Sequence, residues 1–244
     1  MRRPAKWDRS KGRPEPVAAL DRVPLLENHE PLVSIIERCP KVQIHRKHVI
    51  PYLRERVVDM LREASERLPE GLHLAVIDAW RPFARQVRIH EFMLRSAREA
   101  YPDRDGAALR RTLNRWVAPI DRKAPPGHCT GAAVDVFLVD AAGNELDVVS
   151  PYTRFLAAPT YSFGLSSESQ RNRDLLVGAM LDSGFSNCRD EYWHYSYGDA
   201  GWAVRTAAPV CCYGLAELDH ALYAEQERLS EEAMRTRPNP FLAG

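Results

Sequence analysis

Several stretches of the chain repeat apolar residues at the three- to four-residue spacing of an amphipathic helix. Residues 52–68 carry this pattern and are followed by Pro69 and Gly71, which predict the end of a helix there. Pro82 suits the first turn of a second helix, which we expect to run to about residue 100. Similar patterns predict further helices over residues 106–116, 167–184 and 215–234.

Other segments carry the apolar and β-branched residues typical of strands. They cover residues 72–78, 132–139 and 192–197, and the last of them is rich in aromatic side chains. Residues 141–144 have the composition of a hairpin turn. Strands and helices alternate irregularly and no repeat is visible. The pattern therefore predicts a single-domain α+β fold with a central antiparallel sheet flanked by helices.

The pattern changes near both ends of the chain. Residues 1–30 are rich in proline and charge and lack periodicity, which predicts an irregular N-terminal arm. Residues 31–214 hold the predicted strands and most of the predicted helices, and they should form the main domain. Residues 215–244 are expected to form a C-terminal helical extension, in which Pro238 and Pro240 break anything beyond the helix.

Composition narrows the class of protein. The chain has 244 residues, of which 45% are hydrophobic and 27% charged, and its formal net charge is +1. This balance gives no general attraction to nucleic acid or to an anionic membrane, and no apolar run approaches the ~20 residues that span a bilayer. The basic start of the chain is followed by no apolar stretch, so we expect no secretory signal. Five cysteines without paired spacing suit reduced thiols, and we expect a soluble cytoplasmic protein with no nucleic-acid or membrane partner.

The first segment with candidate chemistry is residues 127–135, GHCTGAAVD. One interpretation is a glycine turn that leads into a buried strand. Asp135, however, stands among apolar neighbours, where an unpaired carboxylate is costly to bury, and a metal ion shared with His128 would supply a cation. Two zinc ligands lie about 2 Å from one ion, whereas seven extended residues span about 23–25 Å. The chain must therefore fold back between the two side chains, and Gly131 permits such a turn.

The second segment is residues 191–195, EYWHY. It is either a half-buried aromatic strand with a satisfied histidine, or the base and metal ligand of a metallopeptidase. Positions three apart on a strand face opposite sides, so Glu191 must lie in the turn before the strand, or a bulge must reorient it, if it is to share a site with His194. The pair His90-Glu91 does not begin an H-E-x-x-H motif, because Leu94 stands in place of the second histidine.

Together the two segments supply two histidines, an aspartate and a nearby glutamate. This set matches a catalytic zinc site with three protein ligands and an open position for water, although the same donors also accept other divalent ions. Arg81 lies in the segment DAWRP at the end of a predicted strand. It is either a surface arginine or a fixed guanidinium that stabilises negative charge on an attacked carbonyl.

The three segments DAWRP, GHCTGAAVD and DEYWHYSYGD, in this order, resemble the D-alanyl-D-alanine dipeptidases and their zinc D,D-peptidase relatives over roughly residues 51–214. The resemblance implies an α+β fold and hydrolysis of a small peptide that contains D-alanine. It also implies one Zn²⁺ per chain, bound by the side chains of His128, Asp135 and His194. By the same resemblance Glu191 is the general base, and Arg81 stabilises the transition state.

Departures from the family pattern concern the substrate. Pro126 stands where the family usually has a serine, and Thr153 stands where the dipeptidases carry the acid that pairs with the free ammonium of the substrate. One alternative is therefore a D,D-carboxypeptidase or endopeptidase that acts on larger peptidoglycan fragments. A zinc-binding module without catalysis is a weaker alternative, because Glu191 and Arg81 are both present. A nucleic-acid binder is disfavoured, since no basic stripe alternates with aromatic residues.

Overall fold

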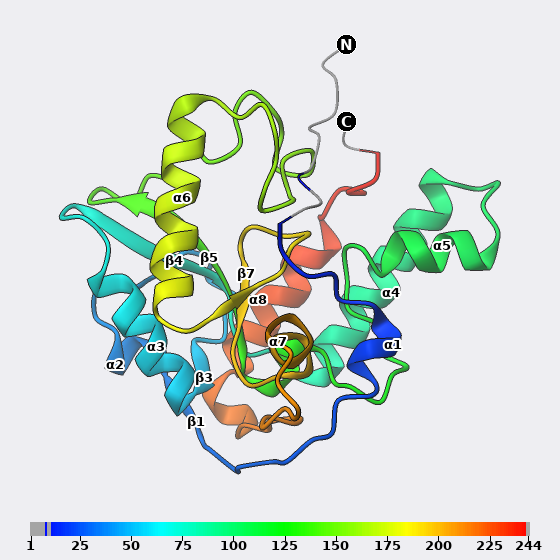
Figure 1. Ribbon diagram of the computed structural model, residues 1–244. Helices are drawn as coiled ribbons and strands as arrows, with labels where there is room; N and C mark the ends of the chain where they lie inside the picture. The colour runs from blue at the N-terminus through cyan, green and yellow to red at the C-terminus, as the bar shows by residue number, and fades with distance from the viewer. Residues whose placement is uncertain (1–7, 9–10, 243–244) are drawn as a thin grey trace.

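A mixed sheet lies at the centre of the computed structural model, which describes residue 8 and residues 11–242 (Figure 1). The strands are β1 (Leu32–Ser34), β2 (Gln43–Ile44), β3 (Tyr52–Arg54), β4 (Leu72–Asp78), β5 (Ala133–Asp140), β6 (Ser186–Asn187) and β7 (His194–Ser196). Within these residues the main sheet has the order β2-β4-β5-β7-β6, and β1 pairs separately with β3. Only β2 and β4 run in parallel in these sheets, and the expected α+β fold is confirmed.

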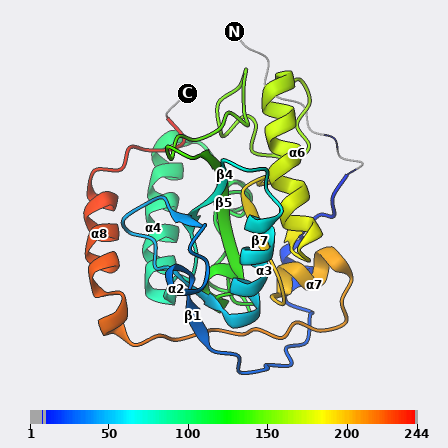
Figure 2. The same cartoon turned by 90° about the vertical axis from the view of Figure 1, so that its left-hand side faces the viewer.

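Helices cover both faces of the sheet. They are α1 (Val17–Leu20), α2 (Ile35–Arg38), α3 (Glu55–Glu66), α4 (Phe83–Ala100), α5 (Gly106–Leu113), α6 (Ser167–Asp182), α7 (Ala200–Thr206) and α8 (Ala224–Arg235). Short 3₁₀ turns cover Gly127–Thr130 and His220–Leu222. Figures 1 and 2 show α3 and α6 on one side of the sheet and α4 and α8 on the other.

The main hydrophobic core fills the layer between the sheet and helices α3 and α6. Val134 and Val136 of β5 are fully buried in one cluster with Leu61 of α3 and Met180 of α6. Neighbouring residues on a strand point to opposite faces, so Asp135, between these two valines, points toward α4 and α8. The candidate metal ligand is thus directed away from the main core by strand geometry alone.

One predicted helix begins later than its apolar pattern suggests. Residues 52–54 form β3 instead of the first turn of a helix, and α3 begins at Glu55. The extended backbone finds partners elsewhere, because β3 pairs with β1 and the backbone N–H of Arg54 donates to the carbonyl of Gly131 at 2.9 Å. Leu53 is buried in either arrangement, so the apolar pattern alone does not distinguish them.

The ends of the chain are more closely attached than the sequence indicates. Residues 1–7 and 9–10 of the predicted arm lie outside the described residues, but Leu25 bridges to Cys211 and Leu20 packs against the buried Ala203. In the C-terminal extension the predicted helix over residues 215–234 begins only at Ala224. The residues before it run along the main domain, where the indole N–H of Trp80 donates to the carbonyl of Ala216 at 3.2 Å. The division at residues 30 and 214 stays a prediction.

Two further features bear on the expected class of protein. None of the helices in the described part of the chain has the length and hydrophobicity that crossing a membrane requires. All five cysteines lie within the described residues and are free thiols, as the sequence predicts.

Candidate metal centre

The register of the sheet places two candidate side chains, Asp135 and His194, in a row with Asp78. Asp135 of β5 lies opposite Asp78 of β4 on one side and opposite His194 of β7 on the other. Residues directly opposite each other in antiparallel strands point to the same face. A register shift between Val76 and Asp78, of the kind a β-bulge makes, brings Asp78 into this row. All three side chains therefore line the same cavity on the face toward α4 and α8.

His128 reaches the row from the turn before β5. The 3₁₀ turn Gly127–Thr130 ends at Gly131, whose φ of +72° reverses the chain as the sequence requires. A Cβ atom at Gly131 would lie 2.3 Å from Cδ2 of Leu32, so a larger residue fits poorly in this turn. Nδ1 of His128 lies 2.8 Å from the carbonyl oxygen of Ala79, which can only accept. The proton therefore lies on Nδ1, and Nε2 presents its lone pair to the cavity.

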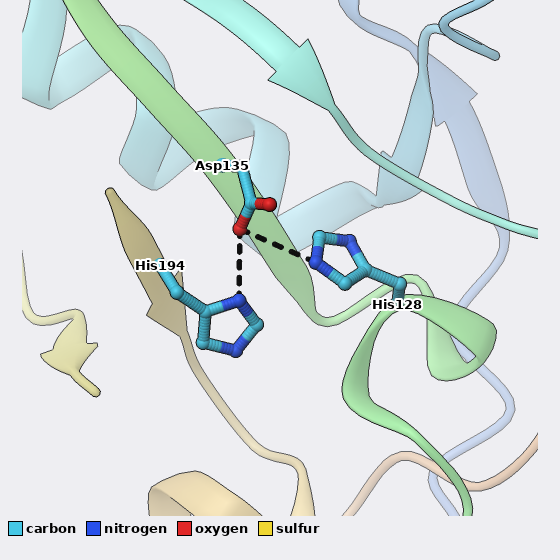
Figure 3. Close-up of side chains that lie close together, drawn as sticks. All are labelled: His128, Asp135 and His194. Atoms are coloured by element: carbon cyan, nitrogen blue, oxygen red, sulfur yellow. Dashed lines mark hydrogen bonds and ion pairs between the residues drawn. The ribbon is translucent and has the colours of Figure 1, made fainter. Parts of the chain in front are cut away.

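The three predicted ligands converge around one carboxylate oxygen (Figure 3). Oδ1 of Asp135 lies 2.8 Å from Nδ1 of His194 and 3.3 Å from Nε2 of His128. One potential ligand atom from each of the three residues lies within 4.8 Å of the other two. Nitrogen and oxygen ligands bind zinc at about 2.0–2.2 Å, so two of them around one ion lie up to about 4 Å apart. The structure thus brings the three side chains together, and the cluster can hold a metal ion after shifts of less than about 1 Å. Their role as metal ligands stays a prediction.

The charges at this cluster also suit a cation. Burial would raise the pKa of Asp135, but the neighbouring imidazoles of His128 and His194 and the hydrogen bonds with them lower it far below its ordinary range. The carboxylate is therefore ionised at neutral pH. Cys129, the neighbour of His128, is a poor nucleophile or ligand, because burial raises the pKa of its thiol to about 12.

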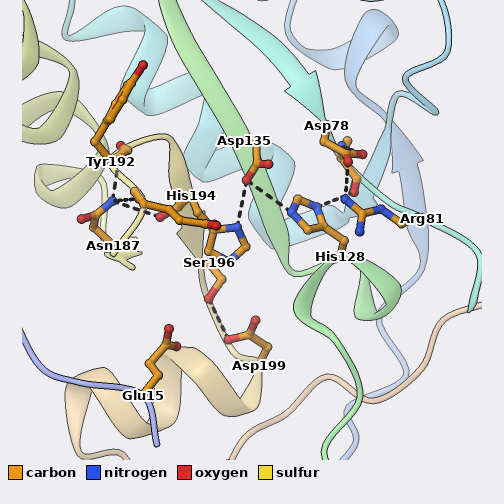
Figure 4. A network of polar contacts seen from close by, with 12 residues as sticks. Glu15, Asp78, Arg81, His128, Asp135, Asn187, Tyr192, His194, Ser196 and Asp199 are labelled. Carbon is orange, nitrogen blue, oxygen red and sulfur yellow. Dashed lines mark hydrogen bonds and ion pairs between the residues drawn. The ribbon is translucent and has the colours of Figure 1, made fainter. Parts of the chain in front are cut away.

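Two side chains hold Arg81 beside the cluster, and Figure 4 shows one of them, Asp78. Nη2 of Arg81 donates to the carboxylate of Asp78, and its Nη1 donates to the side-chain oxygen of Gln86. Gln86 is 1% exposed, and its Nε2 donates to the carbonyl of Ala118 at 3.0 Å. Burial opposes the charge of Arg81, but Asp78 raises the pKa of the guanidinium above its ordinary value. Nε of Arg81 is buried and has no hydrogen-bond partner among the residues that the structure describes.

Glu191 lies in the turn between β6 and β7, where strand periodicity requires it to be. Asn187 holds this turn, because its Nδ2 lies 3.3, 3.4 and 3.0 Å from the carbonyl oxygens of Glu191, Tyr192 and His194. Burial raises the pKa of Glu191 well above its ordinary value, and the negative charge of Asp135 raises it further. A carboxyl group in this environment accepts a proton more readily than an exposed glutamate does.

These side chains share one cavity of about 870 Å³ between the sheet and helices α4 and α8. It is lined by Arg81, His128, Asp135, Glu191 and His194. Its volume lies toward the upper end of the ~300–1,000 Å³ that is usual for small-molecule sites. The arrangement thus combines a potential metal site, a buried carboxyl group and a fixed guanidinium within one pocket.

Comparison with known proteins agrees with this arrangement. A family model described as D-Ala-D-Ala dipeptidase matches residues 41–212. The chain belongs to this family. A D-alanyl-D-alanine dipeptidase of Synechocystis sp. is 30% identical over 178 residues, which cover 63% of this chain and 72% of the relative. Another from Escherichia coli is 25% identical over 161 residues, which cover 66% of this chain and 73% of the relative.

Family membership confirms the resemblance seen in the sequence and makes the protein a peptidase. The D-Ala-D-Ala dipeptidase family is of the metallopeptidase type, which agrees with a cluster that can hold a metal. The cluster, Arg81 and Glu191 all lie inside the matched segment. Residues 213–244, which include α8, lie beyond it.

Two residues that support the site were not predicted from the sequence. Gln86 has a recognisable signal, because it is a polar residue on the buried face of α4, in helical register with Met93 and Ala97. Asn187 has none, since its three acceptors become neighbours only when β6 and β7 pair.

Proposed function

We propose that this protein is a zinc-dependent dipeptidase that hydrolyses D-Ala-D-Ala. The observation that carries the proposal is the convergence of His128, Asp135 and His194 on one wall of a cavity that also holds Glu191 and Arg81. The substrate is supported by the names of the two relatives, both D-alanyl-D-alanine dipeptidases.

The metal would be held by Nε2 of His128, Oδ1 of Asp135 and Nδ1 of His194, the atoms that face one another in the cluster. Two imidazoles and a carboxylate form a donor set that catalytic zinc sites use, with a further position open to water or substrate. Bound there, zinc would polarise the scissile carbonyl and lower the pKa of water. The carbonyl of Ala79 keeps His128 in the tautomer that this role needs.

Glu191 would transfer the proton, and Arg81 would stabilise the developing negative charge. A glutamate with a raised pKa suits a general base, which takes the proton of the attacking water and passes it to the leaving amine. Arg81 would donate to the oxygen of the attacked carbonyl as negative charge develops there. Asp78 and Gln86 fix the orientation of its guanidinium before the substrate arrives.

The decisive experiment compares Glu191→Gln with the wild type. We expect turnover of D-Ala-D-Ala to fall by about 10²–10⁴ while the metal content stays the same. Release of free D-alanine measures the first quantity, and elemental analysis of protein purified without added metal measures the second. Glu70→Gln, at an exposed position outside the cavity, is the matched control.

Two outcomes would contradict the proposal. Unchanged hydrolysis in Glu191→Gln would remove this residue from the mechanism. Protein that contains no metal, and that no added divalent ion activates, would remove the metal. The alternative of a zinc-binding module without catalysis has a separate test. It requires that the wild type itself hydrolyse no peptide.

A D,D-carboxypeptidase or endopeptidase is the second candidate. Thr153, which takes the place of the ammonium-binding acid, is exposed, and the cavity of about 870 Å³ leaves room for a longer peptide. Cleavage of D-Ala-D-Ala and of an N-acylated D-Ala-D-Ala peptide separates the two candidates. Preference for the acylated peptide would favour the second, whereas the cytoplasmic location expected from the sequence, itself a prediction, would favour the free dipeptide.

A further inference from the structure

The C-terminal extension forms one wall of the candidate active-site cavity. Ser230, Ala233 and Met234 of α8 line it, although they lie beyond the segment that matches the family. α8 packs beside α4 (Figure 2). The carboxylate of Glu227 attaches α8 there, because it accepts from Nε of Arg85 at 2.5 Å and also from Arg88.

The residues after α8 are anchored as well. Nδ2 of Asn239 donates to the carbonyl of Ser96 at 2.9 Å, and the ring of Phe241 packs edge-on against Tyr101. Arg237 lies in the sequence between Met234 and these anchors. Met234, like Phe241, packs against an apolar cluster of α4 and α5 that includes Phe92. The guanidinium carbon of Arg237 lies 5.5 Å from the centre of the Phe92 ring. The extension therefore holds Arg237 in place at the cavity, where it is solvent-exposed.

Arg237 and Arg46 bring positive charge to this side of the cavity. Arg46 comes from the loop between β2 and β3 and lines the same cavity. Two other arginines of the cavity have acidic partners, since Arg81 pairs with Asp78 and Arg85 pairs with Glu227.

Neither Arg46 nor Arg237 forms an ion pair with any residue in the part of the chain that the structure describes. The surrounding protein atoms lower the pKa of Arg237, and so do the positive charges of Arg46 and Arg81. The guanidinium groups of Arg46, Arg81 and Arg237 all line this one cavity. An anion bound between Arg46 and Arg237 would relieve this repulsion.

We propose that Arg46 and Arg237 bind the C-terminal carboxylate of the peptide substrate within the cavity that they share with Arg81 and the metal ligands. The inference rests on the proposed peptidase function. A guanidinium group matches the geometry of a carboxylate and binds it through two parallel hydrogen bonds. Every peptide cleaved next to its last residue carries such a carboxylate a few bonds from the scissile amide. The subsite would therefore select substrates with a free C-terminus.

The test compares D-Ala-D-Ala with its C-terminal amide in the full-length protein. For the free dipeptide we expect KM to rise about tenfold in Arg237→Ala and in Arg46→Ala, equivalent to about 1.4 kcal/mol. For the amide we expect KM to change by less than about twofold, and kcat should be conserved for both substrates. Arg237→Lys should keep part of the preference for the free dipeptide over its amide. Arg235→Ala, an exposed position that does not line the cavity, is the control.

The outcomes separate this inference from the proposed function. The subsite is wrong, and the peptidase function stands, if the wild type cleaves the free dipeptide but both alanine variants keep the wild-type ratio of KM for the amide to KM for the free dipeptide. If the wild type cleaves neither substrate, the peptidase function fails and the subsite with it. Inhibition by free D-alanine and by D-alaninamide gives a second readout, in which only the carboxylate compound should bind more weakly to the variants. Arg46 and Arg237 lie in separate segments, so misfolding of one variant leaves the other as a test.

Discussion

The ion pair between Asp78 and Arg81 is the contact outside the metal ligands on which we expect turnover to depend most. Asp78→Asn keeps the size of the side chain and removes its charge. The two side chains are 24% and 12% exposed, so the pair is largely buried. Removing one partner of a buried pair costs about 3–5 kcal/mol of stability. Gln86 still accepts from Arg81, and both groups keep some contact with water, so we expect a loss of about 2 kcal/mol.

The effect on catalysis should be of about the same size as this loss of stability, because a tenfold change in rate corresponds to about 1.4 kcal/mol. Removing a donor from an oxyanion site lowers kcat by about 10²–10³. In Asp78→Asn the guanidinium remains but one of its two fixed contacts is gone, so we expect kcat to fall by about 10–100-fold with little change in KM. Asp59→Asn is a matched control, because Asp59 and Arg62 form an aspartate–arginine pair with the same three-residue spacing on an exposed surface. It should cost less than about 1 kcal/mol and leave kcat unchanged.

Steady-state kinetics with D-Ala-D-Ala and calorimetric unfolding measure the two effects separately. A variant with lowered stability and full kcat would show that the ion pair supports the fold alone. It would refute the reasoning that Asp78 orients Arg81 for the reaction.

Further predictions concern the metal, the pH dependence and the turn before β5. Removal of the metal by a chelator should lower the melting temperature by about 8–16 °C if the ion is present at ~1,000 times its Kd, since this corresponds to about 4 kcal/mol; His194→Ala should abolish the response in calorimetry. The pKa of Glu191 is raised, so its base form is lost as the pH falls through that value, and kcat/KM should decrease on the acid side; a pH profile of Glu191→Gln should lack this limb. Gly131→Ala should lose about 1–3 kcal/mol and bind metal more weakly, because its Cβ would meet Leu32 at 2.3 Å. Gly71→Ala, also at positive φ but with nothing within 4 Å, should cost only the backbone strain and leave metal binding unchanged in a metal titration.

Much of the fold follows from patterns that are local to each element. Strands β4 and β5 and helices α4 and α6 lie within one or two residues of their predicted bounds, because each is a long segment. The turn at Gly131 was predictable for a different reason. Two ligands seven residues apart cannot meet unless the chain reverses, and one glycine stands between them. The position of Glu191 before β7 follows from the same kind of geometric argument.

What could not be predicted depends on register and on contacts between distant segments. The sequence does not reveal that Asp78 lies opposite Asp135, because that pairing depends on a register shift within β4. β3 replaces the first turn of a predicted helix because its hydrogen-bond partners, β1 and the Gly131 carbonyl, come from elsewhere in the chain. The attachment of α8 to α4 through Glu227 is equally invisible, since a glutamate on a helix is usually solvated.

Two different parts of the molecule therefore support the metal cluster and the proposed carboxylate subsite. The row of Asp78, Asp135 and His194 depends on strand register, and a slip of one residue in β5 would turn Asp135 into the main core. The geometry of the metal cluster is therefore fixed by the register of the sheet. Arg237, in contrast, lies on a segment attached to the surface of α4, where exchange of a side chain leaves the sheet untouched. Changes in residues 213–242 should therefore act mainly on KM, whereas changes in β4, β5 and β7 should act on metal content and kcat.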